Sequence, residues 1–112
     1  MNDESQIVVP ESFVDLFRSP GKTRLSAPRD EIVDRYGLCE DLAQLLTTHA
    51  GAMQADLGIA ESDVLTRCHR GLEGHGSGIG PAEAVWVVRR LAELLGWPDP
   101  AWLTGPAADK KV

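Results

Sequence analysis

Apolar residues in the middle of the chain recur at alternating steps of four and three positions, which is the repeat of one face of an α-helix. This seam begins at Ile32 and ends at Leu57, and a second row of residues widens it. The seam consists of Ile32, Tyr36, Cys39, Ala43, Leu46, Ala50, Met53 and Leu57, and the second row of Leu38, Leu42, Leu45 and His49. The pattern predicts a long amphipathic helix that starts at Pro28, ends at Gly58 and buries this face against other helices.

The same kind of periodicity predicts two further main helices. The first spans about residues 61–72, and the second begins at Pro81 and ends before Gly96. The apolar face of the first consists of Val64, Leu65, Cys68 and Leu72. A glycine-rich linker at residues 74–80 separates the two helices. The sequence therefore predicts an all-α fold, a small bundle-like domain of three main helices.

Short helical segments are predicted on both sides of the three main helices. Pro10 opens a helix that continues to about Arg18, because proline is tolerated at the first helical position. The apolar face of this segment carries Phe13, Leu16 and Phe17. Near the other end of the chain, residues 99–103 allow one last turn, from which we expect Trp102 to fold back onto the body of the domain.

The length of 112 residues fits one domain that buries a core without disulfides or a structural metal. We expect this helical domain to occupy residues 10–104, with flexible tails at residues 1–9 and 105–112. The two cysteines, Cys39 and Cys68, both fall on predicted apolar helix faces. Buried free thiols are typical of a reducing compartment, so we expect a cytoplasmic protein.

Charge and hydropathy argue against several classes of partner. The formal net charge is −6 and the isoelectric point is about 4.9, a sign that repels nucleic acids and anionic membranes. No apolar run approaches membrane-spanning length. The turn between the last two main helices is too long and too rich in glycine for a helix-turn-helix motif. We therefore expect neither nucleic acid nor a membrane as the partner.

Two glycine-containing segments resemble parts of phosphate-binding loops. Residues 21–23 (Gly-Lys-Thr) match the end of a P-loop, but Leu16 occupies the position of the first glycine and no strand leads into the segment. The linker at residues 74–80 follows a helix, and Ile79 stands where a dinucleotide-binding motif needs its third glycine. We therefore expect no nucleotide cofactor and interpret the linker as flexible.

Histidine and cysteine side chains form the candidate set for a metal site or a thiol nucleophile. Cys68 and His69 are helix neighbours, so their side chains point about 100° apart and do not form a dyad. A three-ligand site would need Cys68, His75 and a residue from another helix, without any paired-ligand spacing. His49 lies on the apolar face of the long helix and is interpreted as a core histidine. No metal is expected, and Cys68 and His75 are the residual candidates.

Tryptophan and arginine side chains lie on the nominally polar side of the helix predicted at residues 81–95. Trp86, Arg90 and Glu93 fall opposite its wide apolar face, and Trp97 follows just beyond the helix. Tryptophan and arginine are enriched among the residues that dominate protein interfaces, so the Trp86, Arg90 and Trp97 face is a predicted partner-binding site. The alternative is that the N-terminal segment or the tail of the same chain covers both tryptophan rings.

The N-terminal segment is the second candidate for partner binding. Phe13, Leu16 and Phe17 are spaced at i, i+3 and i+4, as in short helices that dock into grooves of other proteins. The alternative is that this apolar face docks onto the long helix of its own chain.

Three runs, in chain order, resemble a family of small uncharacterised proteobacterial proteins. The runs are residues 36–43, 58–61 and 86–97, and the resemblance covers roughly residues 7–103. Members of that family are sometimes labelled as an ATPase with chaperone activity, a name that implies nucleotide hydrolysis. This chain has no intact P-loop and no carboxylate that follows a strand to hold magnesium. The resemblance therefore implies an accessory to an ATPase or chaperone rather than the motor itself.

Taken together, these patterns favour a non-catalytic, cytoplasmic helical domain that binds another protein without a cofactor. The alternative function is a small-molecule or metal site between helices, or a minor enzyme, that uses His49, Cys68, His69 or His75. A homodimer sealed by the Trp86 face is a further hypothesis.

Overall fold

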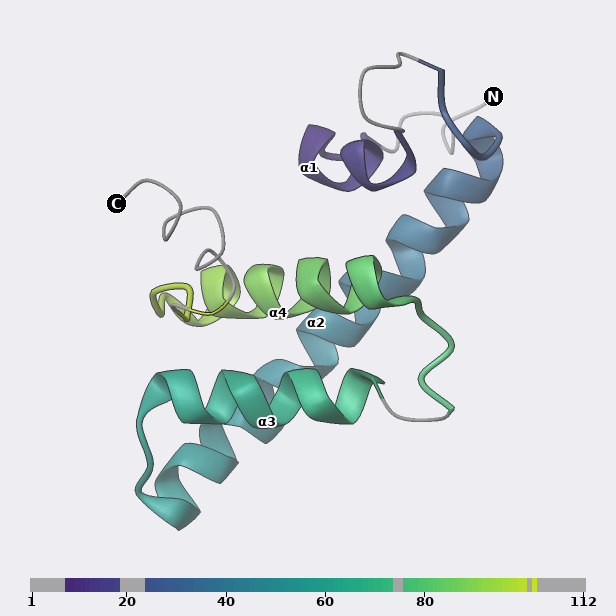
Figure 1. Cartoon of the computed structure of the whole chain (residues 1–112). Coiled ribbons are helices and arrows are strands. Elements are labelled where there is room, and N and C mark those ends of the chain that lie inside the picture. The colour runs from purple at the N-terminus through teal and green to yellow at the C-terminus, as the bar shows by residue number, and fades with distance from the viewer. Residues whose placement is uncertain (1–7, 19–23, 74–75, 101, 103–112) are drawn as a thin grey trace.

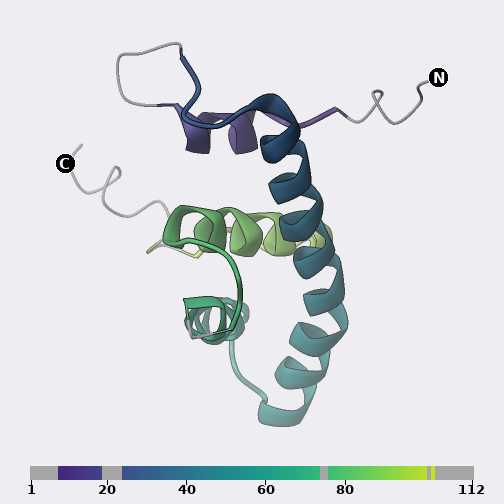
Figure 2. The same cartoon turned by 90° about the vertical axis from the view of Figure 1, so that its right-hand side faces the viewer.

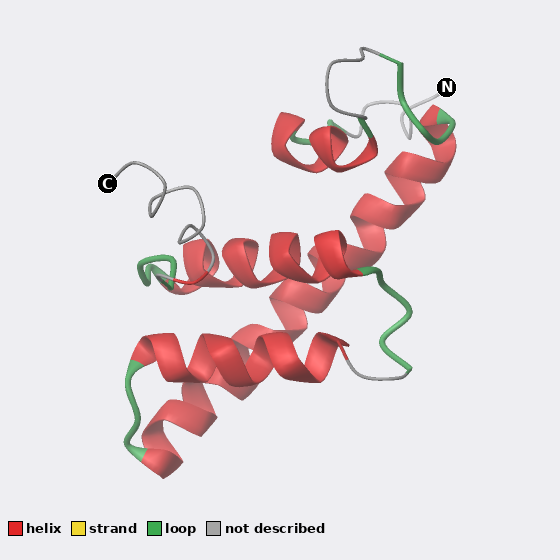
Figure 3. Cartoon of the chain, in the orientation of Figure 1, coloured by secondary structure: helices red, strands yellow, loops and turns green. Residues whose placement is uncertain are grey.

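The computed structural model describes residues 8–18, 24–73, 76–100 and 102. In this part of the chain the structure consists of helices joined by loops, and it contains no strand (Figure 3). The elements are α1 (Glu11–Val14), continued by the 3-10 helix η2 (Asp15–Phe17), and then α2 (Arg29–Leu57), α3 (Glu61–Glu73) and α4 (Pro81–Leu95). The prediction of an all-α domain with three main helices and a short N-terminal helical segment is confirmed.

The bounds of α2 follow from local chemistry. The helix begins after Pro28, and Asp30 and Glu31 occupy its first turn, where negative charge interacts favourably with the helix dipole. It ends at Gly58, whose backbone has a φ of 63° and whose N–H donates to the carbonyl of Gln54 at 2.8 Å. A residue with a side chain is strained in this left-handed conformation, so glycine is the residue that stops the helix here.

The long helix α2 forms one side of the domain, and the other helices pack across it. Figure 1 shows α4 between α1 and α3, and Figure 2 shows α3 and α4 together on one side of α2. In the second view α2 bows around them, as long helices that wrap a core commonly do. None of the helices in the described ranges is long and apolar enough to cross a membrane.

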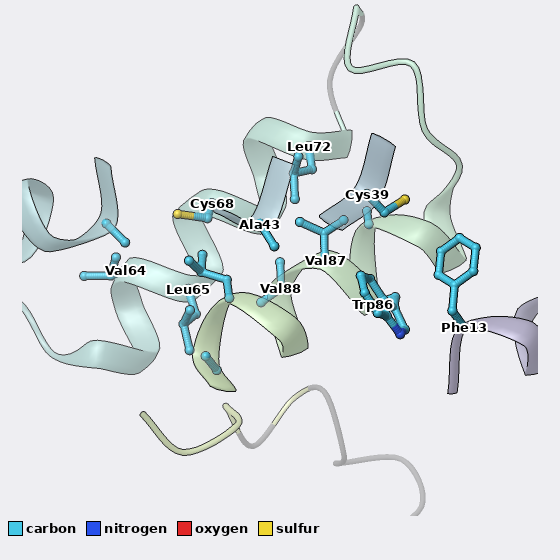
Figure 4. Close-up of a cluster of buried hydrophobic side chains, with 14 of the residues drawn as sticks. Phe13, Cys39, Ala43, Val64, Leu65, Cys68, Leu72, Trp86, Val87 and Val88 are labelled. Carbon is cyan, nitrogen blue, oxygen red and sulfur yellow. The ribbon is translucent and has the colours of Figure 1, made fainter. Parts of the chain in front are cut away.

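The core lies where α4 meets both α2 and α3. Val87 and Val88 are fully buried at its middle, and Figure 4 shows Phe13 and Trp86 at one end of the cluster and Val64 at the other. Both cysteines belong to the core, as the sequence predicts. The buried apolar set is Val9, Phe13, Ile32, Cys39, Ala43, Ala50, Val64, Leu65, Cys68, Leu72, Ala84, Trp86, Val87, Val88, Leu91 and Ala92.

The prediction that the whole widened face of α2 is buried is wrong in part. Leu45 is 73% exposed, Leu57 is 53% exposed and Leu38 is 38% exposed. His49, interpreted from the sequence as a core histidine, is also exposed. The second row is covered only along its edge beside α3, where Leu42 is half-buried and lines a groove together with His49. Leu38 and Leu45 lie farther around α2 from this contact, and Leu57 is the last residue of the helix.

A partly buried ion pair ties α2 to the start of α4. Arg35 donates two hydrogen bonds to the carboxylate of Glu83, at 2.8 and 2.6 Å, and a third to the carbonyl of Gly78 at 2.8 Å. The same carboxylate accepts the backbone N–H of Gly80 at 2.8 Å. The hydrogen bonds from Arg35 lower the pKa of Glu83, against the opposing effect of burial. The described part of the glycine-rich linker is therefore tethered to α2 rather than free of it.

The last described residue, Trp102, folds back onto the body of the domain as expected, and the element that it contacts is α3. Its indole N–H donates to the hydroxyl oxygen of Thr66 at 2.7 Å, and its ring centroid lies 4.7 Å from that of His69.

Candidate functional site

A pocket of about 720 Å³ opens where α1, the N-terminal half of α2 and α4 meet. We call it the α1–α4 pocket. Its walls carry aromatic side chains, arginines and carboxylates together. The lining residues are Pro10, Ser12, Tyr36, Trp86, Arg89, Arg90, Glu93, Trp97 and Asp99.

The α4 wall of the pocket is one face of the helix and the residue just beyond it. Trp86, Arg89, Arg90, Glu93 and Trp97 follow one another at helical spacing, so their side chains line up along the pocket. The C-terminus of α4 positions the last of them. Gly96 has a φ of 74°, and the N–H of Trp97 donates to the carbonyl of Ala92 at 2.9 Å. This closing turn directs the chain back at the pocket rim, where Trp97 is half-buried.

An aromatic cluster forms the inner end of the pocket. The ring of Trp86 lies edge-on to that of Phe13, with centroids 5.1 Å apart, and to that of Tyr36, with centroids 5.8 Å apart. Phe13 also contacts the rings of Tyr36 at 5.7 Å and Phe17 at 5.5 Å. Edge-to-face pairs of this kind stabilise by about 0.5–1.5 kcal/mol each beyond burial alone. The cluster therefore fixes α1 against α2 and α4.

The expectation that Trp86 lies on a solvent-facing side of its helix is wrong. Trp86 is 8% exposed, and its indole N–H donates to the hydroxyl oxygen of Ser12 at 3.0 Å. The alternative raised from the sequence, that the N-terminal segment covers this ring, is confirmed. The reason is that α4 is packed on two sides: the valine face meets α2 and α3, and the tryptophan face meets α1.

Arg90 is held by carboxylates and does not present a free charge. It donates to both oxygens of Glu40, at 2.9 and 3.0 Å, and to Glu93 at 2.8 Å. The hydrogen bonds from Arg90 lower the pKa of Glu40, against burial, and those carboxylates raise the pKa of Arg90. On the rim, Arg89 donates to Asp99 at 3.2 Å. Its side chain is 55% exposed, so this second pair contributes little to stability.

The three N-terminal candidates all pack against the chain's own core. Phe13 is fully buried, and Leu16 and Phe17 are half-buried against the same cluster. Docking within the chain, the alternative weighed for this segment, is confirmed, although its main contacts are with the rings of Tyr36 and Trp86 rather than with α2 alone. Phe13 is therefore a supporting residue of the α1–α4 pocket and is not available as an anchor for a partner.

Two of the histidine and cysteine candidates share a groove. His49 and Cys68 both line a second groove, between α2 and α3, whereas His69 packs against Trp102. His75 lies outside the described residues, as do residues 21–23 of the P-loop-like segment. Within the described ranges, no group of three or more His, Cys, Asp or Glu side chains is arranged to hold a metal ion.

The two thiols are unreactive in the folded protein, and this is a testable expectation. Burial raises the pKa of Cys39 to about 12 and also raises the pKa of Cys68. A disulfide reagent at pH 8 should modify both at least about a hundredfold more slowly than in denaturant, because the thiolate is scarce and access needs local opening. Cys68 should react first, since it is 5% exposed and lines the groove, whereas Cys39 is fully buried. Rapid modification of Cys39 in the native protein would contradict this packing.

Sequence reasoning missed several residues of the pocket. Tyr36 carried a signal, since it belongs to the buried seam of α2 and stands four positions before the acidic residue Glu40, but its place in the seam indicated the core alone. Arg89 stands three positions after Trp86, and that helical spacing indicated a shared face. Ser12 and Asp99 carried no signal, because their roles depend on contacts between segments that are far apart in the chain.

No protein-family model, no curated protein and no solved structure matches this chain. The fold and the geometry of the α1–α4 pocket are therefore the basis for inferring a function.

Proposed function

We propose that this protein is a non-catalytic helical interaction domain that binds a segment of another protein in the α1–α4 pocket. The observation that carries the proposal is the composition of the pocket wall, in which tryptophan, tyrosine and arginine side chains surround an opening of about 720 Å³. These residue types dominate the energetics of protein interfaces. The pocket also sits between rigid helices, so its shape is formed before a partner arrives.

The charges of the pocket favour a neutral, amphipathic segment as the occupant. Arg90 is neutralised by Glu40 and Glu93, and Arg89 by Asp99, so the arginines leave little uncompensated positive charge for a phosphate or a nucleotide. An apolar side chain of the partner would contact Trp97 and Tyr36, and polar groups beside it would pair with the ion pairs of the rim. The resemblance to proteins labelled ATPase with chaperone activity supplies one partner class to test, with this chain as its accessory.

The test is capture of partners from a lysate of the source cells by the immobilised protein and two double variants. Arg89→Ala/Trp97→Ala removes the two rim side chains and leaves Trp86 and Arg90, which hold the fold, in place. Because truncating one hot-spot tryptophan or arginine costs about 2 kcal/mol, we expect the affinity of capture to fall at least about thirtyfold.

The matched control is Arg70→Ala/Trp102→Ala, which removes the same residue types from α3 and the segment packed on it. Its capture should equal that of the wild type. Equal loss of the same protein in both variants, or no loss in the rim variant, would rule out the α1–α4 pocket as the binding site. Circular dichroism and thermal melting show whether each variant is folded.

A further inference from the structure

The flank of α2 that borders the groove beside α3 carries a stripe of apolar residues. Leu38, Leu42, Leu45 and His49 recur at steps of four, three and four, the spacing of a coiled-coil seam. Leu45 is 73% exposed and Leu38 is 38% exposed. Leu42 is half-buried and lies at the edge of the groove, and Figure 2 shows α3 and α4 together on one side of α2.

The same stretch of α2 lacks charge. Residues 42–55 contain no Asp, Glu, Lys or Arg, in a chain in which these types make up 25% of all residues. A helix face that is meant for solvent is normally charged, whereas the centres of protein interfaces are depleted in charge. Burial within the chain does not account for the difference, because Gln44, Thr48 and Ala52 of this stretch are exposed.

The stripe supplies both halves of a knob-and-hole contact. Leu42, Leu45, Leu46 and His49 form the four-residue diamond that receives a side chain from a facing helix. Beside it, a groove of about 420 Å³ between α2 and α3 extends the apolar surface, with Leu42 and Leu46 on its wall. Leu45, the most exposed leucine of the helix, is the matching knob. A surface that offers the knob and the hole together is self-complementary.

We propose that a second copy of this chain packs on the stripe, with the two α2 helices antiparallel and Leu45 of both copies on the two-fold axis. In this register Leu38 faces Ala52 of the second copy, and Asp41 faces His49. A carboxylate and an imidazole then meet at the edge of each uncharged stretch, twice per dimer. A parallel arrangement would place the two Asp41 carboxylates against each other, and like charges across an interface are unfavourable. This dimer leaves the α1–α4 pocket open, because Tyr36, the α2 residue that lines the pocket, lies about 160° around the helix from Leu38.

Sedimentation velocity of the full chain over a range of concentrations tests the proposal. We expect the wild type to shift with concentration from 12.1 kDa to twice that mass. Leu45→Glu should stay monomeric, because it places two charges on the two-fold axis. Leu57→Glu is the matched control: Leu57 is 53% exposed on the same helix but outside the stripe, so this variant should still dimerise. A wild type that stays monomeric up to millimolar concentration would overturn the proposal and leave the stripe for a helix of another protein.

A charge exchange tests the antiparallel register. Asp41→Lys and His49→Glu should each weaken dimerisation about tenfold, because each puts like or unmatched charges at both edges of the interface. The double variant again places opposite charges across the interface and should recover wild-type dimerisation. Failure of the double variant to recover, with both singles weakened, would contradict the antiparallel arrangement.

Discussion

Replacing Phe13 with alanine is expected to release the N-terminal helix from the domain and to lower the free energy of unfolding by about 3–5 kcal/mol. Phe13 is fully buried and touches the rings of Phe17, Tyr36 and Trp86. Its removal leaves a cavity at the junction of α1, α2 and α4 and takes away the contacts that hold Ser12 against the indole of Trp86. For a small domain with about 5–15 kcal/mol of stability, this is a large fraction of the total.

Urea unfolding followed by tryptophan fluorescence measures this loss. Emission of the folded variant should also shift to longer wavelength, because Trp86 is 8% exposed in the wild type and loses its cover when α1 detaches. Val8→Ala is the matched control, since Val8 lies just before α1 and is 80% exposed, and it should change stability by less than about 0.5 kcal/mol. A Phe13→Ala protein that keeps wild-type stability and emission would contradict the docking of α1 on α4.

Arg35→Ala is expected to destabilise the protein by about 3 kcal/mol, because it leaves the Glu83 carboxylate buried without its charge partner. The side chain of Glu83 is 11% exposed and that of Arg35 is 30% exposed. The expected loss of stability therefore lies at the lower end of the range for breaking a buried ion pair. The variant also loses the hydrogen bond to the Gly78 carbonyl, which frees the described part of the linker. Denaturant unfolding at pH 7 measures the change.

Two controls separate the charge from other effects of this substitution. In Arg35→Ala/Glu83→Gln the buried group is neutral but still accepts the Gly80 N–H, so the double variant should be more stable than Arg35→Ala alone.

The pH dependence of stability gives the second control. The folded-state pKa of Glu83 is lowered, so its contribution is present above the unfolded value of about 4.3 and is lost as the pH falls through the folded value. The stability difference between wild type and Arg35→Ala should therefore shrink below about pH 4. A difference that stays constant down to pH 2 would contradict the ion-pair account.

The helices were predictable because their signals are local. Apolar periodicity placed α2, α3 and α4 close to their observed bounds, and Gly58 and Gly96 marked ends that adopt left-handed backbone conformations. These features depend on neighbours within one or two helical turns, which a single sequence displays directly.

The candidate site was predictable in part, because its chemistry depends on contacts between distant segments. Trp86 was selected and lines the α1–α4 pocket, but it was assigned to a free surface, since periodicity does not state how many sides of a helix are covered. Arg90 was selected without Glu40, which lies 50 positions earlier in the chain. The pairing of Arg35 with Glu83 spans 48 positions and carried no local signal. Long-range partners of this kind become visible when the three-dimensional fold is known.

Binding of a protein partner in the α1–α4 pocket is tested most directly by a nuclear magnetic resonance titration that follows the three tryptophan indole signals. The protein captured in the experiment above is added to the nitrogen-labelled chain, and each indole N–H is followed separately. If the partner binds in the α1–α4 pocket, the signal of Trp97, on the pocket rim, shifts strongly, whereas that of Trp102, on α3, stays in place. A shift confined to Trp102, or partner binding that moves neither signal, would contradict binding in this pocket.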